Sequence, residues 1–422
     1  MEASAHGGPP LLRQINSAHV VATLRGAGPL SLSDLAARTG LSRPTVGQVV
    51  DQLQASGLLA WVEPGQAQRA GQDGPDQRSG RSGRPARLVR FRAEAAYVVG
   101  IDIGRHKALV TVADLAGSIV ARHREDASGA SSSADLLAVL RTAARGALAA
   151  AGIRRTDVAS VAAGTPGLVD WPRGAVMLAP GLPGWKIELA RELRRSFRCP
   201  VQVENDANLA ALAERRHGLA RDAHTLVFIY WGERVGAGVL IGDRLHRGAA
   251  NAAGEIGFLA LDPGTTAAPD QFGRGPFERM VGAEAIAEVG RSAAARHGGV
   301  LAGLDGTDTR GAEAVFAAAA QGDVAAVEAV HTIARRFARG LAPVLLVLDP
   351  DLVVIGAGVS RAGSALLAAI EDSVGPLTLV PPRLELSRLG DEAVALGAVE
   401  LALADAETRL LPAPGYPGQA QA

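Results

Sequence analysis

From Tyr97 onward the sequence alternates apolar strand-like segments with amphipathic helical ones, and this alternation restricts the fold more than any other feature. Strands are predicted at 97–103, 107–114, 118–124 and 158–164, with a long helix at 133–152. A second group begins with TLVFIYW and GAGVLIG and ends in LVVIGAGVSRAGSALLAAI, which predicts a strand, a Gly-rich turn and a helix. Such alternation indicates an α/β layered fold. The two hairpin-plus-helix groups predict two similar halves with a ligand cleft between them.

Length and composition set broad limits. With 422 residues the chain is long enough for two or three domains. The sequence contains no run of about 18 or more uncharged apolar residues, so no membrane span is predicted. The start, MEASAHGGPP, lacks the basic and apolar regions of a secretory signal. The single cysteine, Cys199, cannot form an internal disulfide, so we expect a cytoplasmic protein.

The first hundred residues differ from the rest in charge and pattern. Residues 1–95 hold 11 Arg, no Lys and 7 acidic residues, on a chain whose total charge is zero. A helix is predicted over LLRQINSAHVVATLRG, and SLSDLAARTG and LSRPTVGQVVDQLQASG predict two further short helices joined by a Gly-containing turn. This arrangement is a helix-turn-helix. Two strands, LLAWVEPG and RPARLVRF, follow and turn it into a winged helix.

Two parts of this predicted winged helix are suited to binding DNA. The third helix begins with polar residues of the types that contact bases and phosphates from the major groove, namely Ser42, Arg43, Thr45 and Gln48. The segment between the strands, residues 64–84, is rich in Gly and Arg, and we expect it to be a flexible wing. Its Arg81 and Arg84 can reach phosphates or a minor groove. The alternative is a three-helix protein-interaction module with a polar face.

Polar residues at strand ends mark the predicted ligand site. In VENDANLAAL a buried strand ends at Asn205 and Asp206, where α/β folds place ligands. Helix capping alone would also explain either residue. Glu255 lies among glycines and small residues, which let a ligand approach the backbone, although a loop Glu is often only solvated. Trp185, in GLPGWK, can stack on a sugar ring or cover a core edge.

Six segments, taken in order, resemble the ROK family of sugar kinases and sugar-responsive repressors over about residues 97–405. They are DIG (102–104), GTPGLVD (164–170), LPGW (182–185), VENDANLAALAE (203–214), GAGVLIGDRLHRGAANAAGEIG (236–257) and LDPDLVVIGAGV (348–359). The winged helix, with LSRPTV and GRPARLVRF, resembles the repressor branch.

The resemblance implies an actin-like ATPase (ribonuclease H-like) fold of two lobes that hold a sugar or sugar phosphate between them. It also implies which residues contact the sugar. They are Gly167 with its neighbours, Asn205, Asp206 and Glu255, together with Glu278 in GRGPFERM.

Two departures from the family pattern concern nucleotide and metal. Kinases of the family carry small residues and threonine in both phosphate loops, where this chain has Arg105 and His106, and then Glu233 and Arg234. Bulky side chains crowd the backbone N–H groups that would bind phosphate, so we expect no ATP. The family's zinc-binding His is replaced by Phe258, and residues 261–280 contain neither Cys nor His, so we expect no zinc. We expect Phe258, Phe272 and Phe277 to pack together and hold this loop instead.

The sequence therefore predicts a chain of two functional parts. Residues 1–10 are expected to be disordered, 11–93 to form a winged helix-turn-helix, 96–405 to form the two-lobed sugar-binding part, and 406–422 to be a disordered tail. The leading interpretation is a non-enzymatic, sugar-responsive repressor that binds operator DNA as a homodimer or higher homo-oligomer. One alternative is an active ATP-dependent sugar kinase with Asp206 as general base and an attached DNA-binding domain. Another is a constitutive DNA-binding protein with a vestigial cleft.

Overall fold

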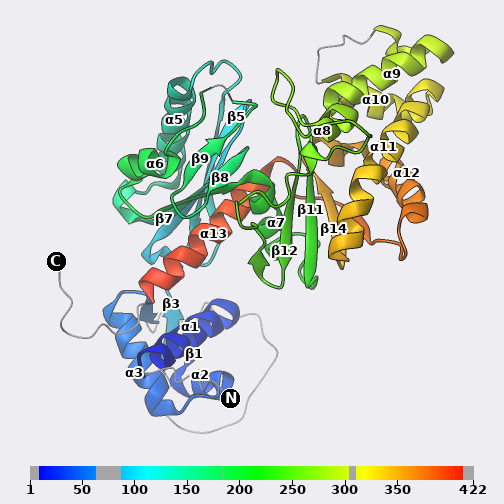
Figure 1. Cartoon of the computed structure of the whole chain (residues 1–422). Helices are drawn as coiled ribbons and strands as arrows, with labels where there is room; N and C mark the ends of the chain where they lie inside the picture. The colour runs from blue at the N-terminus through cyan, green and yellow to red at the C-terminus, as the bar shows by residue number, and fades with distance from the viewer. Residues whose placement is uncertain (1–8, 63–86, 183, 304–309, 412–422) are drawn as a thin grey trace.

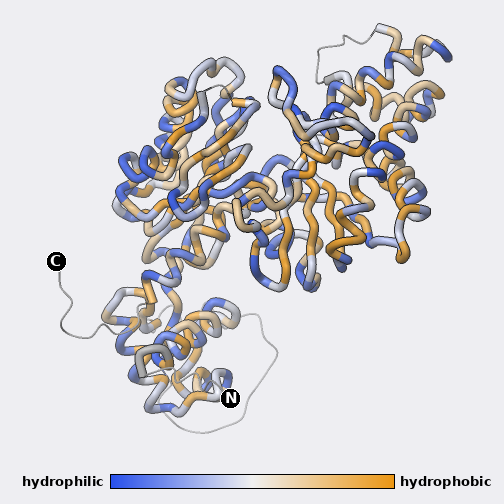
Figure 2. The backbone as a smooth tube through the Cα atoms, in the orientation of Figure 1, coloured by the Kyte–Doolittle hydropathy of each residue, from blue (hydrophilic) through white to orange (hydrophobic). Residues whose placement is uncertain are grey.

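The computed structural model describes residues 9–62, 87–182, 184–303 and 310–411. They form a small N-terminal domain and a larger two-lobed part, which are joined by one long helix, α13 (Ala393–Leu410) (Figure 1). Figure 2 shows that the strands at the centre of the lobes are predominantly apolar, as expected of sheets covered on both faces. No helix in the described part of the chain is long and apolar enough to cross a membrane.

The N-terminal domain is the predicted winged helix. Its helices are α1 (Pro9–Ala27), α2 (Leu32–Thr39) and α3 (Arg43–Ala55), and its strands are β1 (Leu30–Ser31), β2 (Leu59–Trp61) and β3 (Leu88–Phe91). The strands pair antiparallel in the order β1-β3-β2. The side chain of Ser42 caps α3 by accepting a hydrogen bond from the backbone N–H of Thr45, with Pro44 in the first turn. The expected wing, residues 64–84, lies outside the described residues.

The first lobe holds a five-stranded sheet in the order β10-β7-β4-β5-β6. Its elements are β4 (Tyr97–Ile103), β5 (Lys107–Asp114), β6 (Ile119–Asp126), α5 (Ser133–Ala151), β7 (Val158–Thr165), β8 (Leu168–Asp170), β9 (Ala175–Leu178), α6 (Leu189–Phe197) and β10 (Val201–Asn205). Strands β4, β7 and β10 are parallel, whereas β4, β5 and β6 form an antiparallel meander.

The second lobe repeats this topology in a sheet of order β13-β12-β11-β14-β15. Its elements are α7 (Asp206–Arg216), β11 (Thr225–Trp231), β12 (Val235–Ile241), β13 (Arg244–Leu245), α8 (Pro276–Val281), α9 (Ala283–His297), α10 (Arg310–Ala320), α11 (Val324–Leu348), β14 (Leu352–Gly356), α12 (Ser364–Val374) and β15 (Leu384–Leu386). Here too a meander continues into parallel strands. The two similar halves and the actin-like fold are confirmed.

Helix α13 connects the lobes to the winged helix. At its start a Cβ on Gly100 of β4 would lie 2.4 Å from the carbonyl oxygen of Ala395, so helix and sheet are in direct backbone contact. At its far end Leu403, Ala406 and Leu411 belong to one hydrophobic core with Leu24 and Val89 of the winged helix. Arg25 of α1 also binds Glu407, with 2.5 Å between Nη1 and Oε1.

Both predicted chain ends need a correction where the structure describes them. Helix α1 begins at Pro9, inside the segment 1–10 expected to be disordered, because proline is well tolerated in a first helical turn. Helix α13 continues to Leu410, past the expected boundary at 405, because Ala406 and Leu411 are buried in the core that includes the winged helix and Glu407 pairs with Arg25 of α1. The remainder of both segments, residues 1–8 and 412–422, lies outside the described residues.

Candidate functional site

A pocket lies between the two lobes, and all five predicted sugar-contacting residues line it. Gly167 comes from the turn between β7 and β8, Asn205 from the end of β10, and Asp206 from the first position of α7. Glu255 precedes a short 3-10 helix, and Glu278 lies in α8. The cleft thus gathers residues separated by more than a hundred positions in the sequence.

Asn205 fixes the geometry of the pocket floor. Its Oδ1 accepts hydrogen bonds from the backbone N–H groups of Ala207 and Asn208, at 2.9 and 3.3 Å, so it caps α7 as the capping interpretation predicted. Its Nδ2 donates to the carbonyl oxygen of Gly167 at 3.1 Å. One side chain therefore holds both the start of α7 and the turn at Gly167.

Glu204 is a supporting residue to which sequence reasoning gave no role. It is almost fully buried, and its Oε1 accepts hydrogen bonds from the Asn205 backbone N–H and from Asn208 Nδ2, both at 2.9 Å. Arg247 binds the other oxygen at 2.6 Å and lies over the ring of Trp171. In the sequence, only its place in the polar run of VEND indicated a role for Glu204, because its partner Arg247 lies 43 residues away.

Asp206 is the carboxylate best placed to bind a ligand. Its Oδ1 accepts the backbone N–H of Ala207 at 2.8 Å, and within the described chain no protein group is bound to its other oxygen. Burial raises the pKa of Asp206 to about 7, and the negative charges of Asp102 and Glu255 add to this increase. Near neutral pH this group can accept hydrogen bonds from a hydroxyl as a carboxylate, or donate one as an acid.

Glu255 is presented by an unusually close backbone contact. The preceding Gly254 has a φ of 90°, and a Cβ there would lie 1.9 Å from the carbonyl oxygen of Ala237, so only glycine fits. Burial raises the pKa of Glu255, and the charge of Glu278 adds to it. The glycine before Glu255 therefore does allow the close backbone approach on which the binding interpretation relied.

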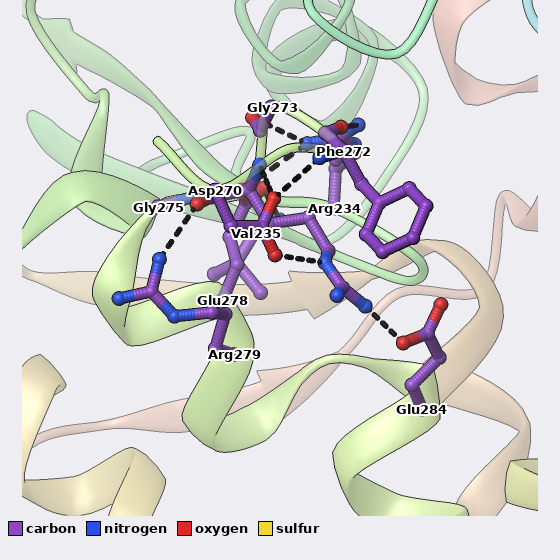
Figure 3. A network of polar contacts seen from close by, with 10 residues as sticks. Arg234, Val235, Asp270, Phe272, Gly273, Gly275, Glu278, Arg279 and Glu284 are labelled. Carbon is purple, nitrogen blue, oxygen red and sulfur yellow. Dashed lines mark hydrogen bonds and ion pairs between the residues drawn. The ribbon is translucent and has the colours of Figure 1, made fainter. Parts of the chain in front are cut away.

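Glu278 lies in the pocket wall, but its carboxylate is already engaged. Its Oε1 accepts the backbone N–H of Val235 and its Oε2 that of Gly275, both at 2.8 Å (Figure 3). Arg234 approaches the same Oε2 at 3.5 Å. Glu278 thus joins β12 to the loop before α8, and its predicted contact with sugar remains a prediction.

The loop 270–275 is held by ion pairs and not by the expected aromatic cluster (Figure 3). Arg234 donates to the carbonyl oxygens of Phe272 and Gly273, at 2.8 and 2.7 Å, and Arg274 binds both Asp270 and Glu284. Phe277 is buried against Phe337, whereas the side chain of Phe272 is 58% exposed, so the predicted packing of Phe258, Phe272 and Phe277 is wrong. Composition alone does not reveal which aromatic residue of a segment is buried.

The residues of this region do not fit a zinc ion. Phe258 lines the pocket where the resemblance implied a histidine ligand, and the loop is stabilised by guanidinium–carboxylate pairs. Zinc requires thiolate, imidazole or carboxylate ligands arranged around one point. Among the described residues there is no group of three or more His, Cys, Asp or Glu side chains so arranged.

Two residues that the resemblance places in the phosphate loops contact each other across the cleft. His106 of the first lobe lies 2.9 Å from Glu233 of the second, measured from Nε2 to Oε1. The Nζ of Lys107 lies 2.8 Å from Oδ2 of Asp102, as an ion pair without hydrogen-bond geometry, and donates to the carbonyl oxygen of Asp391 at 2.6 Å. Arg105 lines the pocket itself.

Trp185 is part of the core and not of the ligand surface. Its side chain is 1% exposed, and its indole N–H donates to Thr165 Oγ1 at 2.8 Å. Of the two alternatives left open by the sequence, the structure favours the core.

The predicted DNA-contacting residues occupy the outer face of α3. Ser42, Arg43 and Gln48 are exposed, and Thr45 is half-buried with its Oγ1 2.8 Å from Ser42 Oγ. Val46, Val49, Val50 and Leu53 form the buried face of the same helix. Arg81 and Arg84 lie outside the described residues.

Comparison with known proteins supports both parts of this description. The ROK family model matches residues 98–405, and the MarR family model matches residues 13–70. A putative xylose repressor of Caldicellulosiruptor sp. (strain Rt8B.4) is 26% identical over 94% of this chain and 98% of that relative. The transcriptional dual regulator NagC of Escherichia coli is 24% identical, with 94% of each protein covered.

Solved structures agree. The crystal structure of a ROK family transcriptional regulator, a homologue of the E. coli Mlc protein, has a TM-score of 0.73 at 25% identity and covers 95% of this chain and 98% of its own. A ROK glucokinase from Streptomyces griseus, in complex with glucose and AMPPNP, has a TM-score of 0.62 at 28% identity and covers 73% of this chain and 99% of its own. The kinase covers 73% of this chain, whereas the regulators cover 94–95% of it. Because the ROK family model matches residues 98–405, most of the sequence, this chain belongs to the ROK family.

Proposed function

We propose that this protein is a sugar-responsive transcriptional repressor. The observation that carries the proposal is the path of α13, which connects the pocket to the winged helix. Helix α7 begins at the pocket residue Asp206 and packs along α13, and the far end of α13 shares a core with the winged helix. The full-length relatives are also named as repressors or transcriptional regulators.

The contact between α7 and α13 is close enough to transmit small movements. A Cβ on Gly397 of α13 would lie 1.8 Å from the carbonyl oxygen of Leu209 in α7, so the two backbones touch. At the other end of α7, His217 binds Glu400 at 2.8 Å. A sugar that draws the lobes together at Asp206 would move α7, and α13 with it. A ligand shifts such an equilibrium only through its different affinities for the two states.

Operator binding requires a pair of winged helices. Helix-turn-helix dimers read two half-sites one helical turn or a multiple apart, so a change in their spacing alters DNA affinity. We therefore infer a homodimer or higher homo-oligomer, with the sugar controlling the separation of the two α3 helices. A repressor of this kind acts where the chromosome is, which places it in the cytoplasm.

We further propose that the cleft has lost phosphotransfer. A bound nucleotide would place its phosphates beside Glu233, and like charges at about 4 Å repel by roughly 1–4 kcal/mol. The His106–Glu233 pair also occupies both loops that would hold them. Asp206 alone favours the second candidate, a kinase with an attached DNA-binding domain, because it stands where a general base is needed.

Thermal melting separates these candidates. In a panel of glucose, xylose and glucose 6-phosphate, we expect at least one compound to raise the melting temperature of the protein. We expect Mg·ATP to leave that temperature unchanged, alone or with the sugar. A shift with Mg·ATP that grows in the presence of sugar would instead favour the kinase and call for a phosphotransfer assay.

The DNA-binding face can be tested one residue at a time. Arg43→Ala should weaken operator binding about 10- to 100-fold, and Gln48→Ala should relax preference at one base-pair position, since each good base contact is worth about 1–3 kcal/mol. Fluorescence anisotropy with labelled operator DNA measures both. Arg141→Ala, on the exposed face of α5 in the first lobe, is the charge-matched control and should leave affinity unchanged. Equal losses in Arg43→Ala and Arg141→Ala would reject α3 as the reading helix.

A further inference from the structure

Phe272 combines an exposed ring with a tightly fixed backbone. Its side chain is 58% exposed. Its N–H donates to Asp270 Oδ1 at 2.9 Å, and its carbonyl oxygen accepts from Arg234 Nη2 at 2.8 Å. In Figure 3 the ring projects away from these hydrogen-bonded groups. Isolated exposed apolar residues are common on protein surfaces, but the backbone of Phe272 is fixed on both sides by charged groups.

The ring borders a hollow that continues the sugar pocket outward. The inner pocket and this outer hollow share part of their walls, including Arg105, Pro180, Gly181, Glu233, Arg234 and Glu278. Phe272 lines only the outer hollow, together with the polar side chains of Gln271, Arg274, Glu284 and Glu288. The guanidinium of Arg274 lies over the Phe272 ring, 4.9 Å from its centroid, so the opposite face of the ring is the one left for a ligand. A ligand confined to the inner pocket therefore leaves the ring uncovered.

The loop that carries Phe272 also touches the opposite lobe. A Cβ on Gly273 would lie 2.0 Å from Cβ of Pro180 in the first lobe, and the guanidinium of Arg234 lies against Gly181. The ring thus stands at the mouth of the cleft, where the lobes meet. A ligand that extends from the inner pocket past this point must pass beside it.

We propose that the outer hollow is a binding site for a second sugar ring, with Phe272 as its stacking platform. This inference rests on the proposed function of the inner pocket as a sugar site. The C–H face of a pyranose is apolar and packs on an aromatic ring, while its hydroxyls bond to carboxylate, amide and guanidinium groups. The outer hollow offers both kinds of partner side by side. The effector is accordingly a disaccharide or longer saccharide, and Phe272 is a specificity-determining residue.

Calorimetric titration of the full-length protein tests this. The probes are glucose and xylose against maltose, cellobiose and xylobiose. We expect one disaccharide to bind roughly tenfold tighter than its own monosaccharide, as one aromatic contact can provide. Phe272→Ala should remove that difference and leave the affinity for the monosaccharide unchanged, whereas Phe272→Trp should retain it. Leu379→Ala, at another strongly exposed apolar side chain, is the matched control and should change neither affinity.

Three results would overturn the second-ring site. They are monosaccharides that bind as tightly as every disaccharide, a Phe272→Ala variant that loses both affinities equally, and a Phe272→Ala variant whose sedimentation changes while its affinities do not. The last would assign the ring to a contact between subunits. If no sugar of either length binds, the proposed function itself fails. If monosaccharides bind and release DNA without any gain from a second ring, only the outer site fails.

Discussion

Asp206→Asn should abolish the response to sugar and at the same time stabilise the protein at alkaline pH. The amide keeps the shape of the side chain and its bond to the Ala207 N–H, but it loses the charge that strengthens hydrogen bonds from sugar hydroxyls. Hydrogen bonds to charged groups contribute about 1.5–3 kcal/mol, so sugar affinity should fall roughly 10- to 150-fold. Calorimetry measures the affinity, and release of labelled operator DNA measures the response.

The gain in stability follows from the raised pKa of Asp206. The pKa is about 7 in the folded protein and about 3.9 in an unfolded chain, so the folded state binds more protons between these values. The free energy of unfolding of the wild type therefore decreases as the pH rises from about 4 to about 7. Asparagine resembles the neutral form, and because Asp206 is partly exposed we expect a gain of only about 1–3 kcal/mol above pH 7.

Melting curves at pH 5 and pH 8 test this part of the prediction. The variant should melt a few degrees above the wild type at pH 8 and much closer to it at pH 5. Asp222→Asn, at an exposed position, is the control and should show no such difference. A gain of equal size at both values would show that Asp206 does not carry the raised pKa. Operator release unchanged in Asp206→Asn would favour the vestigial cleft.

Gly397→Val should separate α7 from α13 and cost several kcal/mol of stability. The nearest obstacle to a side chain at this position is backbone, since the Leu209 carbonyl oxygen and carbon would lie 1.8 and 2.5 Å from the new Cβ. Inserting volume into a packed core typically costs 1–3 kcal/mol, and more where backbone must move. Chemical denaturation of the full chain measures the loss.

A milder variant keeps this prediction testable if Gly397→Val does not fold. Gly397→Ala places the same Cβ against the Leu209 backbone but adds no further branches, so it should cost less stability than Gly397→Val while still displacing α7 from α13. It should bind sugar with near-normal affinity and release operator DNA poorly, because the helix contact that couples the two events is displaced. Gly26→Ala, near the end of α1 with open space around it, is the matched control and should be neutral or slightly stabilising. Normal operator release by Gly397→Ala would mean that the signal does not pass through α7 and α13.

The sequence predicted the parts of the fold that depend on local pattern. The strand over Thr225–Trp231 was predicted residue for residue because its apolar side chains are flanked by polar loops. Asn205 and Asp206 were found because a strand end and a helix start meet there. The repeated hairpin-plus-helix order also predicted the two lobes correctly.

Residues whose roles depend on distant partners were not predictable in the same way. Arg234 was interpreted only as an obstacle to phosphate, yet it binds the backbone of Phe272 and Gly273, almost forty residues later. His106 was likewise interpreted alone, although its partner Glu233 is 127 residues away. The end of α13 was placed too early because its burial depends on the winged helix, at the opposite end of the sequence.

The shared core of α13 and the winged helix has a consequence for how the protein is made. The winged helix is synthesised first, but the end of α13, which shares its core and holds Glu407 against Arg25, is synthesised some 300 residues later. At roughly 5–20 residues per second this delay is tens of seconds. During that time the DNA-reading surface exists without the helix that orients it, and a nascent or truncated chain lacks the geometry of the finished regulator. Exchange of operator specificity between relatives would accordingly require both ends of the sequence to be transplanted together.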